Sequence, residues 1–339
     1  MTQASTEFKN RDFAVINCSN KDELAKELNN PLVASSGGIG EIVVVNIHKI
    51  MERSEMPEVH NDYNVPVQRI FFVDEAHRSY NKHGEFYKNL MTCDDDALYF
   101  ALTGTPILKK SEKSNLKFGD YIHKYFYDKS IADGYTLRIK KEQIDTTAKT
   151  EIRENLEIEN QDLNSADVYE SDAYIESVSK YIEKDFRQFR LVNSDNTIGG
   201  MIVCRSNKQA KLIHEWFSQH GQLTTGLVMS DSDNNVVQNL LNKQNQINFR
   251  ENGYPDILVV HYMLTTGYDV KRLKKMYLLR GPRAQSLLQT ISWVNRPYKS
   301  PNGKTYYQVA KMCCKKDVLD IIEKYAKIQQ SERIQRGLK

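Results

Sequence analysis

Two adjacent acids at the end of an apolar run are the residues of this chain best suited to catalysis. Asp74 and Glu75, followed by Ala76 and His77, come directly after Arg69–Val73. Such a run is typical of a buried strand, and open α/β sheets bind their ligands at the carboxyl ends of their strands. In nucleoside triphosphatases the first acid binds Mg²⁺, directly or through water, and the second accepts a proton from the attacking water. The alternative is a strand that runs into a helix, whose first turn favours Asp and Glu.

A second polar group follows the next apolar run. Thr103, Gly104 and Thr105 stand at the end of the segment that begins at Tyr99. Small hydroxyl side chains around a glycine allow close approach of the backbone and can relay a change at a bound nucleotide to a neighbouring lobe. The alternative is a turn that ends a strand, which Gly104 and the following Pro106 favour.

Three further polar residues and a glycine that could approach a ligand lie in the last third of the chain. Gly267 and Asp269 follow the apolar run Ile257–His261, and Gln289 and Arg296 come after them. A Gln and an Arg on a helix that begins near the end of a strand can reach into a cleft between two lobes. Arg296 is therefore a candidate arginine finger, a cation that stabilises charge on a transferring phosphoryl group. The alternative is a surface arginine without a catalytic role.

The composition indicates a globular chain with room for two domains. With 339 residues, of which 40% are hydrophobic and 27% charged, the chain is neither small nor disordered. A net charge of +3 is too small to indicate a nucleic-acid partner by itself. The local cluster Lys271, Arg272, Lys274 and Lys275 is a candidate DNA contact, although such a run is usually a solvated face.

Cysteine usage and hydropathy bound the environment of the chain. The 5 cysteines are odd in number and form no C-x-x-C, which excludes a disulfide framework and a zinc pattern. Cys204 ends an apolar run and is expected in the core. No apolar run is long enough to cross a membrane, and no signal peptide precedes the fold. We therefore expect a reduced, cytoplasmic protein without a membrane partner.

Short apolar runs that alternate with helical segments predict an α/β fold with parallel sheets. Several runs lack polar alternation, as strands covered on both faces should. The expected strands are Ile42–Ile47, Ile70–Val73, Tyr99–Thr103, Met201–Cys204, Gly226–Met229, Ile257–His261, Met276–Leu279 and Tyr306–Val309.

A region without glycine or proline between Gly134 and Gly199 predicts a mostly helical connector between two lobes. Ser171 and Asp172 are its candidate N-caps. An apolar stripe at helical spacing should pack against the lobes; its members are Ile175, Val178, Ile182, Phe186 and Phe189. The expected organisation is a first lobe over 1–115, the connector over 116–195, a second lobe over 196–311 and a C-terminal helix over 312–339.

The order of these segments carries more information than any one of them. D-E-A-H, T-G-T-P, T-x-G-x-D and Q-x-x-x-x-x-x-R resemble motifs II, III, V and VI of superfamily 2 helicases. The residues in and around these motifs resemble those of the R (HsdR) subunit of type I restriction enzymes. The segments that resemble this family are Phe71–Ser79, Ala101–Pro106, Phe118–Gly134, Met263–Asp269 and Leu287–Tyr298.

The resemblance implies two RecA-like lobes, the first incomplete, that close on ATP and step along double-stranded DNA. By motif, Asp74 would bind Mg²⁺, Glu75 would activate water and Arg296 would complete the site. The nucleotide-binding residues would be Gly267, Asp269 and Gln289, and the residues that couple the lobes would be His77, Thr103, Gly104 and Thr105. In this family a nuclease domain precedes the motor, and the specificity and methylation subunits are its partners.

The chain departs from the family in two places. The P-loop pattern G-x-x-x-x-G-K-[ST], whose N–H groups and Lys hold phosphates, does not occur upstream of Asp74. Gly303-Lys304-Thr305 spells its end, but Pro301-Asn302-Gly303 predicts a hairpin-like turn there. Trp293 stands where the family has an arginine, and Trp cannot donate a fork of charged hydrogen bonds to phosphate. We therefore expect the isolated chain to be inactive.

The sequence thus predicts the ATP-dependent DNA translocase portion of a type I restriction endonuclease R subunit, without its P-loop and nuclease parts. One alternative is another superfamily 2 helicase or translocase. A second is a non-catalytic remnant that binds DNA or partner subunits, which the missing P-loop and Trp293 favour for the chain as it stands.

Overall fold

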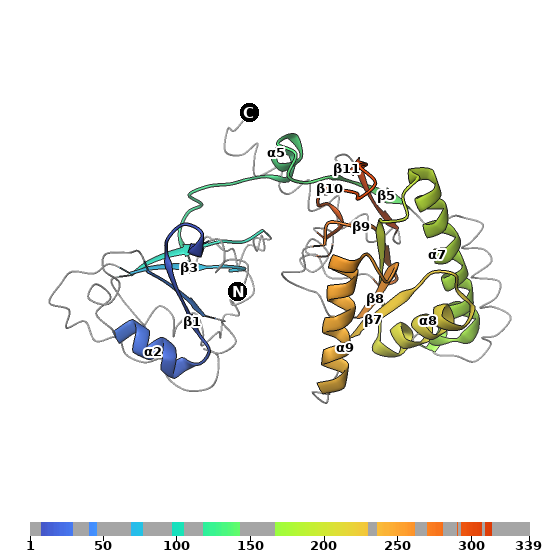
Figure 1. Ribbon diagram of the computed structural model, residues 1–339, viewed down its shortest axis with the longest axis horizontal. Coiled ribbons are helices and arrows are strands. Elements are labelled where there is room, and N and C mark those ends of the chain that lie inside the picture. Colours follow the sequence, from blue (N-terminus) through green and yellow to red (C-terminus); the bar gives the residue numbers. More distant parts are fainter. Residues whose placement is uncertain are drawn as a thin grey trace. The chain divides into compact units, whose positions relative to one another are not determined.

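The chain forms two compact units, Met1–Ile122 and His123–Lys339, in a computed structural model (Figure 1). The structure describes residues 8–29, 41–45, 69–76, 97–104, 118–142, 167–229, 236–261, 270–280, 290, 293–306 and 309–313.

In the first unit, parallel strands pair in twos. β1 pairs with β2 and β3 pairs with β4, and Val73 at the end of β3 faces Ala101 at the end of β4. Cys18, Leu24, Val73 and Ala76 form the buried core of the described part of this unit. The elements are β1 (Ala14–Cys18), α2 (Lys21–Asn29), β2 (Glu41–Val45), β3 (Ile70–Val73) and β4 (Leu98–Ala101).

The second unit is built on a parallel sheet of 6 strands in the order β5-β12-β9-β6-β8-β7. Its central strands β6 and β8 are apolar and buried, so they lack the alternation of strands with one wet face. The strands are β5 (Arg138–Glu142), β6 (Gly199–Val203), β7 (Thr225–Met229), β8 (Ile257–His261), β9 (Leu273–Leu278) and β12 (Val309–Cys313). A separate antiparallel hairpin joins β10 (Tyr298–Lys299) to β11 (Thr305–Tyr306).

Helices cover both faces of this sheet. Figure 1 shows α7 and α8 on one side of it and α9 on the other. One buried cluster joins α7 and α8 to the sheet, and a second contains Phe249, Trp293 and Val294 on the opposite side. The helices are α5 (Tyr127–Ala132), the 3₁₀-helix η2 (Asp167–Glu170), α7 (Asp172–Asn193), α8 (Asn207–His220), α9 (Val236–Ile247) and the π-helix η3 (Asn248–Asn252).

Helix α7 confirms the capping and the apolar stripe expected for the connector. The hydroxyl of Ser171 accepts a hydrogen bond from the N–H of Tyr174, and the helix begins at Asp172. All five residues of the stripe are buried against the second unit. Because α7 packs on this sheet, this helix of the expected connector is part of the second unit's fold.

The α/β class with parallel sheets is confirmed, and the boundaries of its strands differ from expectation in places. Ile70–Val73 and Ile257–His261 are strands with the expected bounds, and Cys204 is fully buried. The expected strand Tyr306–Val309 instead spans the end of β11 and the start of β12. β5 was not expected, because its sequence R-I-K-K-E has no apolar run. It pairs with β12 and brings part of the expected helical connector into the sheet.

Gly199 stands where a side chain would collide with the core. A Cβ built there would lie 2.5 Å from Cζ of Phe249, whose ring is fully buried. We expect Gly199→Ala to lower the free energy of unfolding by about 1–3 kcal/mol, because overpacking forces the ring to move. Urea denaturation of the single variant and of Gly199→Ala/Phe249→Leu would test this. If the smaller side chain at 249 relieved none of the loss, the collision would not be its cause.

Candidate functional site

The paired acids occupy a turn at the carboxyl end of β3. The side chain of Asp74 is exposed and that of Glu75 is half-buried. The N–H of Leu102 donates to the carbonyl of Val73 at 2.9 Å, and the N–H of Ala76 donates back to the carbonyl of Leu102 at 3.0 Å. The turn that carries the acids is therefore bonded to the segment that continues β4 into Thr103 and Gly104. Two expected motifs meet at one edge of a parallel sheet.

The backbone of Glu75 is in the left-handed region, with a φ of 49°. Its N–H donates to Oδ1 of Asp74 at 2.8 Å. Residues other than glycine adopt this conformation uncommonly, and such residues concentrate at functional sites. Residues 74–76 thus form a turn, so the acids are not part of a helical first turn within the described residues.

Several expected site residues cannot be placed in this geometry. His77, Thr105, Gly267, Asp269 and Gln289 lie outside the described residues. The nucleotide-binding and coupling roles given to them stay predictions, as do the coupling roles of Thr103 and Gly104.

The carboxyl ends of the second unit's strands carry polar residues that the sequence reasoning missed. Arg205 follows β6, and its guanidinium lies 3.9 Å from the ring centroid of Tyr169. His261 ends β8, and its Nδ1 lies 2.8 Å from Oδ1 of Asn207. Burial lowers the pKa of His261, and the charge of Arg280 lowers it further. The signal that could have found these residues is their position directly at the ends of expected strands.

The segment Trp293–Arg296 is fixed to the second unit by its backbone and its core side chains. Trp293 and Val294 are buried in the core. The carbonyl of Asn295 accepts from the N–H of Leu137 at 2.6 Å, and the carbonyl of Arg296 accepts from Nζ of Lys274 at 2.6 Å. The side chain of Arg296 is exposed. The expected arginine finger therefore projects from a backbone that is held on two sides.

The expected basic surface at 271–275 is wrong for three of its four residues. Arg272, Lys274 and Lys275 are 4%, 0% and 1% exposed. Lys275 forms an ion pair with Asp185 at 2.5 Å. A buried, bonded cation cannot contact a DNA phosphate, so these three residues are corrected to internal roles. Lys271 is exposed, and its contact with DNA stays a prediction.

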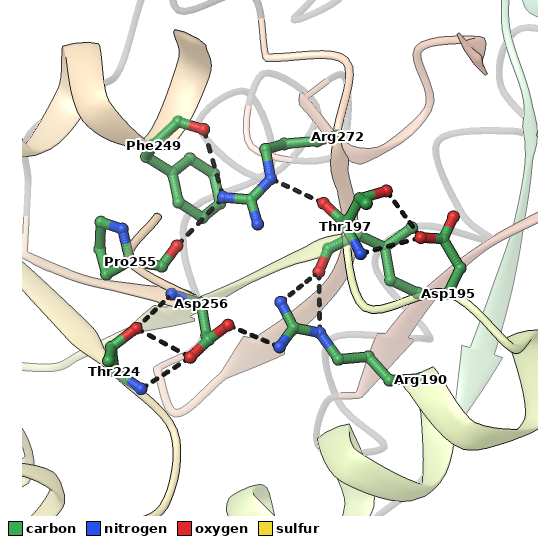
Figure 2. Close-up of polar contacts among 9 residues, drawn as sticks. Arg190, Asp195, Thr197, Thr224, Phe249, Pro255, Asp256 and Arg272 are labelled. Atoms are coloured by element: carbon green, nitrogen blue, oxygen red, sulfur yellow. Dashed lines mark hydrogen bonds and ion pairs between the residues drawn. The ribbon is translucent and has the colours of Figure 1, made fainter. Parts of the chain in front are cut away.

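Two buried arginines bond the loops at the amino ends of the strands (Figure 2). The Arg272 guanidinium donates to three carbonyl oxygens, those of Thr197 at 2.8 Å, Pro255 at 3.0 Å and Phe249 at 3.3 Å. Arg190 donates to the carbonyl of Ile198.

Arg190 also pairs with Asp256, whose side chain is half-buried. Nη1 of Arg190 lies 2.5 Å from Oδ1 of Asp256. Burial alone would raise the pKa of Asp256, but the N–H and hydroxyl of Thr224 and the charge of Arg190 outweigh it and lower that pKa. Asp256 is therefore held as a carboxylate that ties β7 and β8 to α7.

The first unit offers a ligand of the type that Mg²⁺ prefers. Mg²⁺ binds proteins through one or two carboxylates and keeps several waters, so the exposed carboxylate of Asp74 at a strand end fits this role. Within the described parts of the chain, no group of three or more His, Cys, Asp and Glu is placed to hold a metal. No described helix is long and apolar enough to span a membrane.

Parallel sheets with polar residues at the carboxyl ends of their strands are an arrangement in which α/β proteins bind ligands. The SWI2/SNF2 ATPase family matches residues 1–172, about half of the chain. The chain belongs to the SWI2/SNF2 ATPase family.

Similar proteins are longer than this chain. The subunit named for the type I restriction enzyme MjaIXP of Methanocaldococcus jannaschii is 27% identical over 86% of the chain and 30% of its own length. The HindI endonuclease subunit of Haemophilus influenzae is 23% identical over 77% of the chain and 28% of its own length. The chain thus spans about 30% of the length of these relatives.

A solved structure supports the fold. The ATP-dependent Type ISP restriction-modification enzyme LlaBIII bound to DNA matches with a TM-score of 0.58 and 14% identity. The match covers 90% of this chain and 23% of that enzyme. RecA-like α/β units are therefore the fold of this chain, as the sequence predicted.

Trp293 gives a first prediction, because the family that the sequence resembles has arginine there. Trp293 is 7% exposed within the core. We expect Trp293→Arg to lower the free energy of unfolding by at least about 3 kcal/mol, since it removes a large apolar contact and brings a charge to that place. Urea denaturation beside Trp293→Phe, which keeps an aromatic ring, would test this. A fully stable arginine variant would mean that this side chain turns out of the core.

Asp256 gives a second prediction, which depends on pH. We expect Asp256→Asn to lower the free energy of unfolding by about 3 kcal/mol at pH 7, because it leaves Arg190 without its carboxylate. A carboxylate whose pKa is lower in the folded than in the unfolded chain stabilises the folded state at pH values above its unfolded pKa of about 4. This stabilisation is lost as pH falls through the pKa of the folded state. The difference in free energy of unfolding between the variant and the parent should therefore become smaller as pH falls from 7 toward 3. Denaturation curves at several pH values would measure it.

The control for this prediction is an exposed pair. Glu176 and Lys180 form an ion pair one turn apart on α7, with both side chains more than half exposed. Glu176→Gln should cost less than about 0.5 kcal/mol at any pH. An equal effect of both substitutions, or an Asp256→Asn cost that did not change with pH, would contradict the assignment.

Proposed function

We propose that this chain supplies the acid-bearing part of the first motor lobe and the second motor lobe of an ATP-driven translocase on double-stranded DNA. The parent protein would be the R subunit of a type I restriction endonuclease. The observation that carries the proposal is the bonded junction of residues 74–76 with Leu102 at the ends of β3 and β4. The relatives support it, since they are named as endonuclease subunits of type I restriction enzymes.

In this proposal the acids of the first unit divide the chemistry between them. Asp74 would hold Mg²⁺, which neutralises charge on the phosphates of ATP when it is bound. Glu75, in its left-handed backbone conformation, would accept a proton from the attacking water. Thr103 and Gly104, beside this turn, would report the state of the nucleotide to the other lobe.

The second unit would add the remaining cation. Arg296 would stabilise the charge that develops on the transferring phosphoryl group. Its exposed side chain and its anchored backbone suit this role, because a finger must reach a ligand without moving its base. Asp74 and Arg296 belong to different units, so their meeting at one nucleotide is part of the proposal.

Partners and location follow from the same proposal. The expected partners are duplex DNA and the specificity and methylation subunits, and the expected location is the cytoplasm. Another superfamily 2 helicase or translocase remains the alternative for the parent protein. A non-catalytic remnant that binds DNA or partner subunits remains the alternative for the chain alone.

The test is phosphate release with saturating duplex DNA and Mg²⁺. We expect none from the isolated chain, because the sequence contains no phosphate cradle of the P-loop type. Fusion of a segment that contains a P-loop upstream of Met1 should give turnover. Glu75→Gln should lower that turnover by about 100-fold or more, as loss of a general base does.

The matched control is Asp22→Asn, which removes an exposed carboxylate from α2 of the same unit. It should leave turnover within a factor of about two. Turnover of the fusion that Glu75→Gln did not change would contradict the catalytic role. Turnover of the isolated chain that Glu75→Gln abolished would contradict the need for a P-loop.

A further inference from the structure

The second unit has a hollow of about 950 Å³ at the amino ends of its strands. Four loops line it: residues 196–197 before β6, residues 250–253 at the end of η3, residues 271–272 before β9, and the β10–β11 hairpin. In a parallel sheet this edge lies opposite the carboxyl ends, where Arg205 and His261 are found. Arg296 directly precedes Pro297 of the lining, and its carbonyl is bonded to Lys274 at the start of β9, so the candidate arginine finger lies beside the hollow. Lys271 and Arg272 of the expected basic cluster are part of this lining, together with Pro301 of the predicted turn.

The lining of the hollow is strongly cationic. Arg250, Lys271 and Lys299 are exposed, and Arg272 lies buried at its floor. Glu251 is the one acid among the lining residues, and it forms an ion pair with Arg250. The net charge of the lining is therefore positive. Its cations come from segments far apart in sequence.

The floor of the hollow is held in place before any ligand arrives. Figure 2 shows Arg272 joining Thr197 to the segments before β8. Its guanidinium also lies over the ring of Phe249, at 4.6 Å from the centroid. Oδ1 of Asp195 accepts from both the N–H and the hydroxyl of Thr197. A prearranged surface of this kind binds a ligand with a smaller loss of entropy.

We infer that this hollow binds the phosphate backbone of duplex DNA, as a contact separate from the carboxyl edge of the same sheet. The inference rests on the proposed function, since it takes DNA as the ligand. Lys and Arg beside small polar donors are the usual partners of phosphates, and the lining supplies Asn196, Asn252 and Thr305. Gly253, with a φ of 77°, has no side chain to block approach to its backbone.

An acidic protein segment fits the hollow less well. Protein partners gain most of their affinity from aromatic and apolar anchors in a buried pocket. The aromatic side chain here, Tyr298, is already engaged: its hydroxyl donates to Oγ1 of Thr197 at 3.1 Å, and Nζ of Lys274 lies 5.8 Å from its ring centroid. The remaining lining is charged, polar, or proline at Pro297 and Pro301.

The separation of the two edges suits one continuous duplex. β6 and β8 have 5 residues each, so the edges lie roughly 17 Å apart at about 3.3 Å per residue. That distance corresponds to about five phosphates along one strand. A duplex bound at the hollow could therefore extend to the carboxyl edge within about five phosphates. Such a contact reads no bases, so it would be independent of sequence.

The test compares two triple variants of the full chain. Arg250→Gln/Lys271→Gln/Lys299→Gln removes the three exposed cations of the hollow. Lys184→Gln/Arg187→Gln/Lys211→Gln removes three exposed cations from α7 and α8, with the same change in net charge. Binding to a labelled 20-base-pair duplex is followed by fluorescence anisotropy at several salt concentrations. Thermal denaturation confirms that both variants are folded.

We expect the hollow variant to bind at least tenfold more weakly at low salt. Its plot of log affinity against log salt should be less steep by about 2 to 3, because each lost phosphate contact removes about 0.9 from the slope. The control should bind within about twofold of the parent, with the same slope. Equal losses in both variants would overturn the inference and leave DNA binding itself intact.

Two further outcomes separate the remaining explanations. A parent chain that bound no duplex at low salt would overturn both this inference and the DNA partner of the proposed function. A hollow variant that kept DNA binding but lost binding to a labelled poly-glutamate peptide would overturn the inference in favour of a protein partner. The same peptide titration on the control variant shows whether a loss of peptide binding is caused by the cations of the hollow or by the change in net charge.

Discussion

Two consecutive buried lysines on β9 are the constraint on which the second unit depends. Nζ of Lys275 pairs with Asp185 of α7 at 2.5 Å, and the hydroxyl of Tyr277 donates to the same carboxylate at 2.7 Å. A buried ammonium costs several kcal/mol unless it is paired, so the sheet requires α7 for its stability. Lys274 depends in the same way on the segment Trp293–Arg296, because its Nζ donates to the carbonyl of Arg296. A strand with two leucines in these places would need neither partner.

This arrangement connects the candidate chemistry to the fold. Gly199 pairs with Leu273 and Gly200 with Lys275, so Lys274 is an extra residue in β9, as in a β-bulge. The bulge lets Lys274 reach the backbone of Arg296, while Leu137, before β5, bonds to Asn295. Leu137 is fully buried in the core cluster, so this hydrogen bond joins the arginine segment to the sheet core.

The sequence was sufficient for features set by local patterns and insufficient for those set by distant partners. Ile70–Val73 and Ile257–His261 are apolar runs between polar ends, and α7 has a cap and a stripe, so each could be predicted. The basic run at 271–275 was misread because Asp185, which buries Lys275, lies far away in sequence. β5 was missed because a charged edge strand has no apolar signal. The hollow was missed because Arg250, Lys271 and Lys299 become neighbours only in the folded sheet.

The two edges of the second sheet are supported in different ways, and this difference bears on how a motor lobe can work. At the amino edge, Arg190, Asp256 and Arg272 bond the loops to one another and to α7, so that edge is rigid. At the carboxyl edge, Arg205 and His261 are bonded to residues of η2 and α8, near the surface. The candidate finger Arg296 belongs to the amino edge, because its carbonyl is bonded to Lys274 at the start of β9. A cation that must reach a phosphoryl group is best carried by a backbone held in place, and the network of Arg190, Asp256 and Arg272 holds the loops of that edge.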